Sequence, residues 1–270
     1  MGRDVDELAA AADANLVAHA GWVQRRLPGM RVIEEGGLVL VDSGLPCDTF
    51  NVVCGARLER DDAPHRAGEA IAYFRDAGRH FSWWVGPADR PHDLGDLLLA
   101  AGLASAEGEV AMAADLASLR VGELSPGGLR VERVRTQDQL ADFARIVAAT
   151  WTPPDPQVLR FYALAAPVLL RPDAPLRFYV GYLGDVPVAA SELTVAGGVV
   201  GLYSICTLAA YRRRGFGGAL TLRPLLDARA EGHRTGILQA APGAVGIYTR
   251  VGFAPFGEYS EYKPVDAASG

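Results

Sequence analysis

Residues 211–219 read Tyr-Arg-Arg-Arg-Gly-Phe-Gly-Gly-Ala and follow an apolar run that ends near Leu208. A segment of helical character begins at Gly215, so the glycines stand where a strand gives way to a helix. Backbone N–H groups with no side chain in the way, together with the positive end of the helix dipole, can hold a phosphate or pyrophosphate. The pattern therefore predicts an anion site at this junction.

The same residues also have a simpler interpretation, in which the arginines form a solvated face and the glycines form a turn. An Arg/Gln-x-x-Gly-x-Gly string arises by chance about 0.4 times in a chain with this much glycine and arginine. The string is neither a P-loop, since no Gly-Lys-Ser/Thr follows, nor a dinucleotide fingerprint after a first strand. Its surroundings must therefore decide between the two interpretations.

Two further stretches accompany the loop. Residues 205–207 (Ile-Cys-Thr) belong to the strand before it, and residues 247–253 (Ile-Tyr-Thr-Arg-Val-Gly-Phe) follow it. Together with residues 212–218, these stretches resemble the core of the GCN5-related N-acetyltransferases, the GNAT family. The resemblance covers residues 129–262, including the order of strands and helices. It implies an α/β fold with a mixed, mostly antiparallel central sheet flanked by helices.

Hydrophobic periodicity predicts the elements of the second half of the chain. Thr136 is a candidate N-cap, and Gly184-Asp185 and Gly197-Gly198 separate apolar runs as hairpin turns do. Pro224 lies inside a predicted helix and should kink or interrupt it. The predicted strands are 129–134, 177–183, 186–195, 199–208, 236–240 and 254–262, and the predicted helices are 136–150, 157–170, 215–232 and 244–250.

The distribution of charge and turn residues predicts two domains. Residues 1–127 carry 11 basic and 20 acidic side chains, whereas residues 128–270 carry 15 and 12. Residues 125–128 (Ser-Pro-Gly-Gly) form a turn-forming cluster with the composition of a short linker. We expect one domain over residues 1–124 and a second over residues 128–270.

The first domain is predicted to repeat the element order of the second. Its junction at residues 57–64 (Arg-Leu-Glu-Arg-Asp-Asp-Ala-Pro) has no glycine and carries acids that would repel a pyrophosphate. We therefore expect two GNAT-like domains in tandem, the first a degenerate copy that does not bind coenzyme A. Its aromatic run at 81–84 either lines a substrate cleft or packs in the core. The predicted helices are 5–27, 64–78 and 93–101, and the predicted strands are 31–34, 38–41, 49–58, 80–85 and 109–114.

The resemblance implies acetyl-CoA as the cosubstrate. The pantetheine arm would lie along Ile205, Cys206 and Thr207, where one backbone N–H would polarise the thioester carbonyl. Arg212 occupies a position that the family usually fills with Gln or Arg. The family's pyrophosphate loop maps onto a run of basic, aromatic and glycine residues, namely Arg213, Arg214, Gly215, Phe216, Gly217 and Gly218.

Two side chains are candidates for proton transfer. The family's tyrosine corresponds to Tyr248, which would act as general acid toward the departing thiolate, unless it is only a packed tyrosine. Many members carry a glutamate base on the strand before the loop, but residues 201–204 (Gly-Leu-Tyr-Ser) contain none. Glu192 on the preceding strand is therefore the candidate base, with a solvent-facing acid as the alternative.

The chain departs from the family at one more position, and one competing nucleophile has to be weighed. Many members carry an asparagine near the start of the tyrosine helix, where residues 241–244 read Ala-Pro-Gly-Ala. The corresponding contact to the cosubstrate is missing or replaced. Cys206 is conceivable as a nucleophile, but no histidine lies near it in sequence, and a small apolar strand residue is the better interpretation.

Composition argues against several other classes of protein. All basic residues except Lys263 are arginine, which reflects a coding bias, and the net charge of −6 disfavours a nucleic-acid partner. The three cysteines and five histidines lack the spacing of a disulfide framework or a metal site. No run reaches the roughly 18 apolar residues of a membrane span, and residues 1–20 begin with acids rather than the basic start of a secretory signal. We expect a cytoplasmic protein with no membrane partner and no metal.

The sequence thus predicts an N-acetyltransferase that moves an acetyl group from acetyl-CoA to an amine by direct attack in a ternary complex. The acidic first half could focus a cationic acceptor, so a small amine is the expected partner. Three alternatives stay open, namely a non-catalytic acyl-CoA sensor or interaction module, an enzyme acting on a protein amine, and a donor longer than acetyl. The oligomeric state also stays open.

Overall fold

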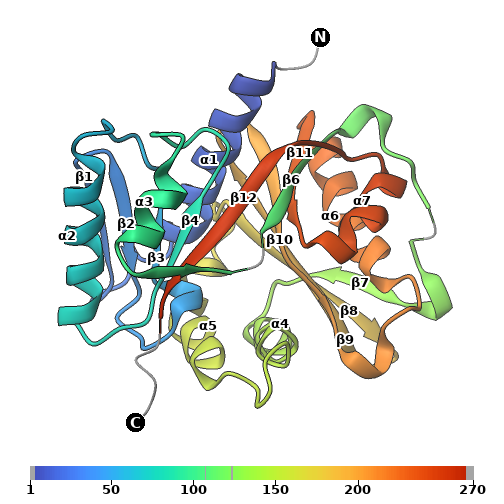
Figure 1. Cartoon of the computed structure of the whole chain (residues 1–270). Coiled ribbons are helices and arrows are strands. Elements are labelled where there is room, and N and C mark those ends of the chain that lie inside the picture. Colours follow the sequence, from blue (N-terminus) through green and yellow to red (C-terminus); the bar gives the residue numbers. More distant parts are fainter. Residues whose placement is uncertain (1–3, 107, 123, 266–270) are drawn as a thin grey trace. The chain divides into compact units, whose positions relative to one another are not determined.

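The computed structural model describes residues 4–106, 108–122 and 124–265. These residues divide into two compact units, which Figure 1 traces by sequence colour. The larger unit contains residues 111–256, and the smaller unit contains residues 4–110 together with 257–265. The chain therefore enters the larger unit once and returns to the smaller unit at its C-terminal end.

This division differs from the predicted linker at 125–128 for a physical reason. The Leu116 N–H donates to the Arg234 carbonyl at 2.8 Å, and the Arg120 N–H donates to the Val251 carbonyl at 2.9 Å. These bonds tie the segment before the predicted linker to the larger unit. The turn at Pro126–Gly128 does form, but it lies inside that unit.

The sheet of the larger unit has the strand order β6-β11-β10-β9-β8-β7. Its strands are β6 (Glu109–Asp115), β7 (Arg130–Arg133), β8 (Leu176–Leu183), β9 (Val186–Ala196), β10 (Val199–Thr207) and β11 (Thr235–Ala240), and β12 (Ala254–Pro264) begins in this unit. Its helices are α4 (Gln137–Ala148), α5 (Pro156–Leu169), α6 (Phe216–Ala230) and α7 (Val245–Val251). Strands β7 to β10 are antiparallel neighbours, whereas β10 and β11 run parallel. The predicted mixed α/β architecture is confirmed.

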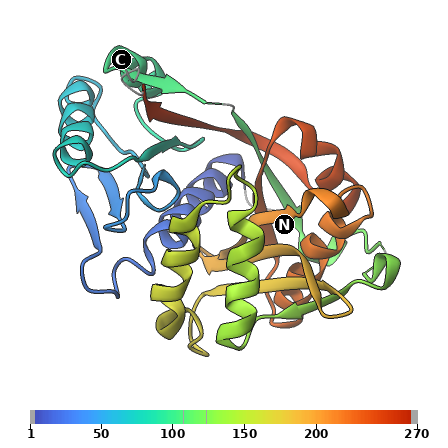
Figure 2. The same ribbon diagram turned by 90° about the horizontal axis from the view of Figure 1, so that it is seen from below.

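Helices α4 and α5 lie side by side on one face of this sheet, and α6 covers the other face (Figures 1 and 2). Aromatic rings fill the layer under α4 and α5. The Phe143 ring meets the Tyr162 ring at 5.1 Å and the Phe178 ring at 4.9 Å between centroids, in edge-on geometry. All three side chains are buried. Such contacts stabilise the layer and fix ring orientation.

Local sequence signals define several element ends as predicted. The Thr136 hydroxyl accepts a hydrogen bond from the Gln139 N–H at 3.3 Å, and the Gln139 side-chain oxygen accepts one from the Thr136 N–H. These two bonds form a capping box at α4. The hairpin between β8 and β9 turns at Gly184, and the hairpin between β9 and β10 turns at residues 197–198. All three glycines have positive φ, which these tight turns require.

Helix α6 runs unbroken through Pro224, so the predicted interruption is wrong. Proline has no N–H to donate to the carbonyl four residues earlier, which here belongs to Leu220. The hydroxyl of the buried Ser191, on β9, donates to that Leu220 carbonyl at 2.8 Å. The strand thus supplies the hydrogen bond that the proline cannot make.

This compensation predicts a coupled pair of substitutions. Ser191→Ala should lower the free energy of unfolding by about 1–3 kcal/mol, because it leaves a buried carbonyl without a donor. In a Pro224→Ala background the same substitution should cost less, since a backbone N–H at position 224 can then donate to the Leu220 carbonyl. Urea unfolding of the four proteins in the cycle measures the difference. Equal costs in both backgrounds would contradict this account of α6.

The smaller unit has its own sheet, in the strand order β1-β2-β3-β4-β12, with β5 also paired to β12. Its strands are β1 (Arg31–Glu35), β2 (Leu38–Asp42), β3 (Val52–Cys54), β4 (Ser82–Val85) and β5 (Leu103–Ser105), and β12 contributes from residue 257 onward. Its helices are α1 (Val5–Gly21), α2 (Ala63–Asp76) and α3 (Leu94–Ala100). The short β5 was not expected from the sequence.

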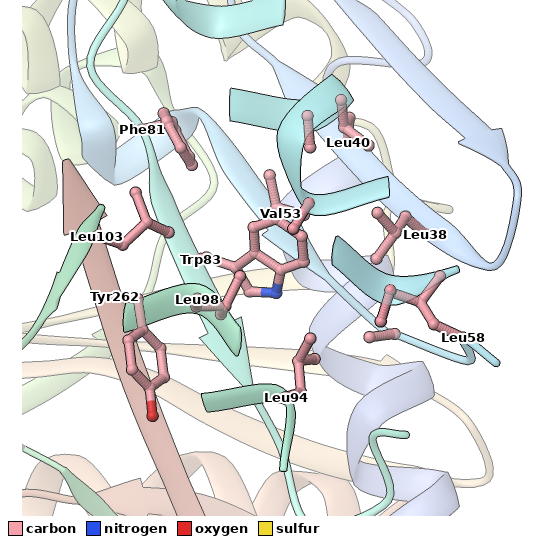
Figure 3. Packing of buried hydrophobic residues seen from close by; sticks show 14 of the residues in the cluster. Leu38, Leu40, Val53, Leu58, Phe81, Trp83, Leu94, Leu98, Leu103 and Tyr262 are labelled. Carbon is pink, nitrogen blue, oxygen red and sulfur yellow. The ribbon is translucent and has the colours of Figure 1, made fainter. Parts of the chain in front are cut away.

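The core of the smaller unit gathers around Trp83 of β4, which is fully buried (Figure 3). Phe81 is buried in the same cluster, and its ring stacks on the Phe74 ring at 4.7 Å. These two residues of the aromatic run therefore pack in the core, as the second of the two interpretations proposed. The predicted strand at 49–58 is shorter than expected, because residues 48–50 form a 3-10 turn before β3.

Candidate functional site

Strands β10 and β11 begin side by side and then part. Their parallel register joins Val200–Leu202 to Gly236–Leu238, although β10 continues to Thr207 and β11 to Ala240. The paired residues of β10 are buried, whereas residues 203–207 are half-buried. The half-buried residues include those predicted to line the cosubstrate arm, Ile205, Cys206 and Thr207. The end of β10 therefore has backbone and side chains accessible beside β11.

A bulge marks the point where β10 leaves its neighbour. Tyr203 is paired with Glu192 of β9, but the next recorded pair joins Cys206 to Ala190, so β10 contains one residue more than β9 across this interval. Ser204 lies in the bulge with φ of 51°, a left-handed conformation that is rare for a residue with a side chain. The bulge therefore changes the direction of β10 at the point where β10 separates from β11.

The arginine loop follows β10 directly. The Arg212 Nε donates to the Thr207 carbonyl at 3.1 Å, which fastens the loop to the end of the strand. Arg213 has φ of 61°, and the guanidinium of Arg214 lies 5.4 Å from the centroid of the Tyr211 ring. All three arginines are exposed. Their positive charges therefore lie around the loop and are exposed to solvent.

The glycines occupy the start of α6. Gly215 is the N-cap, with φ of 83°, and Phe216 is buried beneath it. A Cβ added at Gly217 or Gly218 would meet no heavy atom within 4 Å, so the space above the first turn is open. The first N–H groups of a helix have no intrahelical acceptor and carry its positive dipole end. This arrangement can hold a phosphate or pyrophosphate, as the sequence predicts.

A polar cluster lies under the bulge on the face covered by α4 and α5. Glu192 is 1% exposed and accepts a hydrogen bond from the Thr194 hydroxyl at 3.1 Å. Tyr162 of α5 is also buried, and its phenol is hydrogen-bonded to the Ser204 side chain. Burial first, and then the nearby Glu192 and Cys206, raise the pKa of Tyr162 well above its ordinary value. The predicted solvent-facing alternative for Glu192 is wrong, because the carboxylate is inside the protein.

The environment of Cys206 disfavours nucleophilic chemistry. Burial raises the pKa of its thiol to about 12, against a small lowering by the Ala190 backbone and Arg212. Only the thiolate is strongly nucleophilic, so the thiol stays protonated and unreactive near neutral pH. Cys206 therefore serves as a small strand residue.

Tyr248 lies on α7, which packs beside α6 (Figure 1). Its side chain is 7% exposed, and its ring centroid is 6.3 Å from that of Phe253 in edge-on geometry. The segment that replaces the family's asparagine forms a 3-10 turn at Pro242–Ala244, directly before α7. The structure thus brings the helix of the tyrosine next to the helix of the glycines, while Glu192 approaches β10 from the opposite face.

Comparison with known families agrees with this geometry. Residues 117–236 match the family described as an acetyltransferase (GNAT) domain. The larger unit, which contains these matched residues, is termed the GNAT domain. The matched range includes β10, the arginine loop and Glu192, and it ends before Tyr248.

Solved structures resemble the whole chain rather than the GNAT domain alone. A GCN5-related N-acetyltransferase from Kribbella flavida has a TM-score of 0.71 at 21% identity, covering 95% of this chain and 97% of its own. The corresponding protein from Sphaerobacter thermophilus has a TM-score of 0.62 at 15% identity, with coverages of 99% and 96%. A tandem GNAT protein from the clavulanic acid biosynthesis pathway has a TM-score of 0.58 at 15% identity, with coverages of 97% and 94%. These likenesses show the fold. No curated protein matches the chain.

In the smaller unit the segments that follow β3 and β4 stay paired, whereas β10 and β11 of the larger unit part. Strands β3 and β4 pair in parallel over Val52–Val53 and Ser82–Trp83. The segments that follow meet again, because Arg57 and Arg90 form a parallel bridge and the Arg90 N–H donates to the Ala56 carbonyl at 3.1 Å. The opening between these strands is closed at its far end.

Charged side chains occupy the space between these two segments. The Arg57 guanidinium contacts Asp89 at 2.9 Å and Asp13 at 3.3 Å, and the Tyr259 hydroxyl donates to Asp13 at 2.9 Å. Both aspartates are buried. Burial and the neighbouring Asp13 carboxylate raise the pKa of Asp89. Two carboxyl groups around a single arginine offer a pyrophosphate no net positive charge, which agrees with the acidic junction in the sequence.

Sequence reasoning missed two members of the polar cluster in the GNAT domain, Tyr162 and Ser204. Tyr162 lies on a helical segment with no motif, and it comes near Glu192 only because its ring contacts Phe178, the partner of Glu192 on β8. Ser204 could have been noticed as the polar residue where the family's strand glutamate is absent. Its bulged conformation has no signal in sequence, because bulges depend on pairing between strands.

Among residues 4–106, 108–122 and 124–265, no group of three or more His, Cys, Asp or Glu side chains could hold a metal ion. Within the same residues, no helix is both long and apolar enough to cross a bilayer.

Proposed function

We propose that the chain is an N-acetyltransferase that transfers an acetyl group from acetyl-CoA to a small amine. The observation that carries the proposal is the continuous path from the open end of β10, through the arginine loop, to the glycine-lined start of α6. A thioester arm requires accessible backbone to pair with its amides, and a pyrophosphate requires free N–H groups and positive charge. This path offers both in the order in which coenzyme A carries them.

Each part of the path has a proposed role. Backbone groups of Ile205, Cys206 and Thr207 pair with the arm, and one N–H polarises the thioester carbonyl. The N–H groups at the start of α6 hold the pyrophosphate, and the loop arginines add charge. These loop residues are Arg212, Arg213, Arg214, Gly215, Phe216, Gly217 and Gly218.

The proposed reaction is direct attack in a ternary complex. The amine nitrogen forms a bond to the thioester carbonyl carbon, and the carbon–sulfur bond then breaks. Tyr248, as general acid, gives its proton to the departing thiolate, and Glu192 is the final acceptor of the proton that the amine loses. The reaction needs no covalent enzyme intermediate, which fits a protonated Cys206.

The acceptor is proposed to be cationic before it reacts. The buried Glu192 carboxylate provides negative charge beneath the bulge, and an ammonium ion is favoured by such a field in a low-dielectric site. The acidic composition of residues 1–127 would add to this attraction. A small primary amine is therefore the expected class of acceptor.

The smaller unit is proposed to be a degenerate second copy of the GNAT fold. Its order of helices and strands parallels that of the GNAT domain, and its strands β3 and β4 begin as a parallel pair, as β10 and β11 do. The likeness to a tandem GNAT protein over 97% of this chain supports the proposal. The bridged strands and buried acids explain why this copy would not take coenzyme A.

The function is tested by titrating the purified protein calorimetrically with acetyl-CoA and then following thiol release against a panel of small amines. We expect saturable binding and amine-dependent release of coenzyme A. Binding without release by any amine would favour an acyl-CoA sensor or a protein acceptor, which a peptide panel would then separate. Absence of binding would show that the arginine loop is only a turn.

A further inference from the structure

We propose that Ser204 and Tyr162 form a proton relay that connects the reacting amine to the buried Glu192 carboxylate. The inference rests on the proposed function and identifies two side chains that the reaction would need. Ser204 would touch the amine, directly or through one water, while Tyr162 would act through Ser204.

The need for a relay follows from burial. Glu192 is 1% exposed and lies on β9, so strand β10 and its bulge stand between the carboxylate and the open edge of β10. A general base must lie within hydrogen-bond reach of the proton that it removes, or reach it through an intermediary. Glu192 can serve as base only if other groups carry the proton to it.

Ser204 is placed at the outer end of such a path. It belongs to the half-buried stretch of β10 beyond the last residue paired with β11. Its left-handed backbone at φ of 51° is held by the bulge. Strained conformations of this kind concentrate at functional sites. Its hydroxyl is hydrogen-bonded to the Tyr162 phenol, so two members of the path are already joined.

Tyr162 is placed at the inner end and is held there rigidly. Its ring contacts Phe143, Phe161 and Phe178 at centroid distances of 5.1, 5.4 and 5.8 Å. Tyr162 contacts Phe178 of β8, whose partner in the sheet is Glu192, and the nearby Glu192 and Cys206 both raise the pKa of the phenol. Cys206 keeps its proton, because burial raises the pKa of its thiol, so Glu192 is the group to which the relay would deliver the proton. The Thr194 hydroxyl orients the carboxylate from the side.

The relay balances as a concerted transfer. An ammonium proton of the acceptor passes to the Ser204 oxygen and the Ser204 proton passes to the Tyr162 oxygen, which leaves a neutral amine nitrogen that bonds to the thioester carbon. The Tyr162 proton then passes to Glu192. Both hydroxyls end neutral, and Glu192 ends protonated. The second proton, which the nitrogen loses on bonding, balances the proton that Tyr248 gives to the thiolate. No tyrosinate accumulates, which agrees with the raised pKa of the phenol.

Tyr162→Phe tests the relay, since it removes one oxygen and keeps the packed ring. At about pH 7 we expect kcat/KM for the best amine of the panel to fall about 100-fold, while calorimetric affinity for acetyl-CoA is unchanged. The decrease in kcat/KM caused by the substitution should become at least tenfold smaller as the pH nears the pKa of a free alkylamine, about 10, because the amine then arrives already deprotonated. Ser204→Ala should give the same pH-dependent deficit.

Tyr182→Phe is the matched control. Tyr182 is likewise buried beneath α4, where its hydroxyl donates to Asp142 at 2.9 Å, outside the end of β10. It should leave the pH profile unchanged. A deficit in Tyr162→Phe that is equal at all pH values would overturn the relay and indicate a packing role. In that case the proposed function would stand, since binding and turnover by the unaltered protein are measured separately.

A second measurement does not depend on the acceptor. In protein labelled with ¹³C at the tyrosine Cζ, the resonance missing from Tyr162→Phe belongs to Tyr162. We expect this resonance to move in Ser204→Ala and in Glu192→Gln and to stay in place in Tyr182→Phe. If the chemical shift of Tyr162 were the same in Ser204→Ala and in Glu192→Gln as in the unaltered protein, the relay would be overturned, even if no amine were turned over.

Discussion

Gly217→Val should weaken the binding of acetyl-CoA about 100-fold or more while leaving the fold intact. A side chain at this position would project into the open space over the first turn of α6, where no protein atom lies within 4 Å of an added Cβ. The branched side chain would hold the pyrophosphate away from the N–H groups. Each charge-assisted hydrogen bond is worth about 1.5–3 kcal/mol, so losing even two accounts for the expected change.

Gly68→Val is the matched control for that substitution. Gly68 lies within α2 of the smaller unit, and an added Cβ there also meets no atom within 4 Å. It should leave affinity for acetyl-CoA unchanged. Gly215→Val is a less clean test, since its φ of 83° would strain any side chain. Isothermal titration calorimetry measures all three variants, and unchanged affinity in Gly217→Val would remove the pyrophosphate site from α6.

Arg213→Ala should have a smaller effect on the same measurement. Arg213 is exposed, and an exposed charge acts on a phosphate through screened water. The backbone N–H groups of α6 would remain in place. The contrast between the glycine and the arginine separates recognition by the backbone from recognition by side-chain charge.

The elements of the chain were largely predictable because their signals are local. The capping box at Thr136 and the glycine turns at 184 and 197–198 act over a few residues, and each forms where the sequence places it. The glycine-lined start of α6 was predictable for the same reason. Pro224 shows the limit of such rules. It cannot donate to the Leu220 carbonyl, and Ser191 on β9, far away in the sequence, donates to that carbonyl instead.

The division into units could not be predicted, because it depends on long-range hydrogen bonds. A turn-forming cluster at 125–128 has the composition of a linker, but composition carries no information about partners. The bonds from Leu116 and Arg120 to the larger unit form only in the fold. The return of the chain to the smaller unit is similarly fixed by contacts such as that of Lys263 with Asp48.

The conformation of the glycine loop in the candidate site was predictable, whereas its cluster of polar side chains was predictable only in part. Glu192 was identified from strand alternation, yet its burial follows from the packing of α4 and α5 against the sheet. Tyr162 belongs to a helix that carries no motif. A cluster assembled from α5, β9 and β10 has no spacing in sequence that could reveal it.

Tyr248→Phe should lower amine-dependent release of coenzyme A about 100- to 10,000-fold and leave affinity for acetyl-CoA unchanged. The substitution removes only the hydroxyl, and the ring can keep its contact with Phe253. Without a proton donor the alkylthiolate must depart as an anion, which raises the barrier to breaking the carbon–sulfur bond. The loss should therefore appear in kcat rather than in binding.

The matched control for this substitution is Tyr179→Phe, which removes another buried hydroxyl, one that donates to Asp227 at 3.1 Å on the α6 face of the sheet. It should cost stability and leave turnover intact. Full turnover in Tyr248→Phe would show that Tyr248 is a packing residue and that water or another group acts as the general acid. Intact binding of acetyl-CoA with no turnover in the unaltered protein would instead favour the sensor, because a sensor has no rate for the hydroxyl to support. Binding and rate measured on the same three proteins thus separate a catalyst from a module that only recognises the cosubstrate.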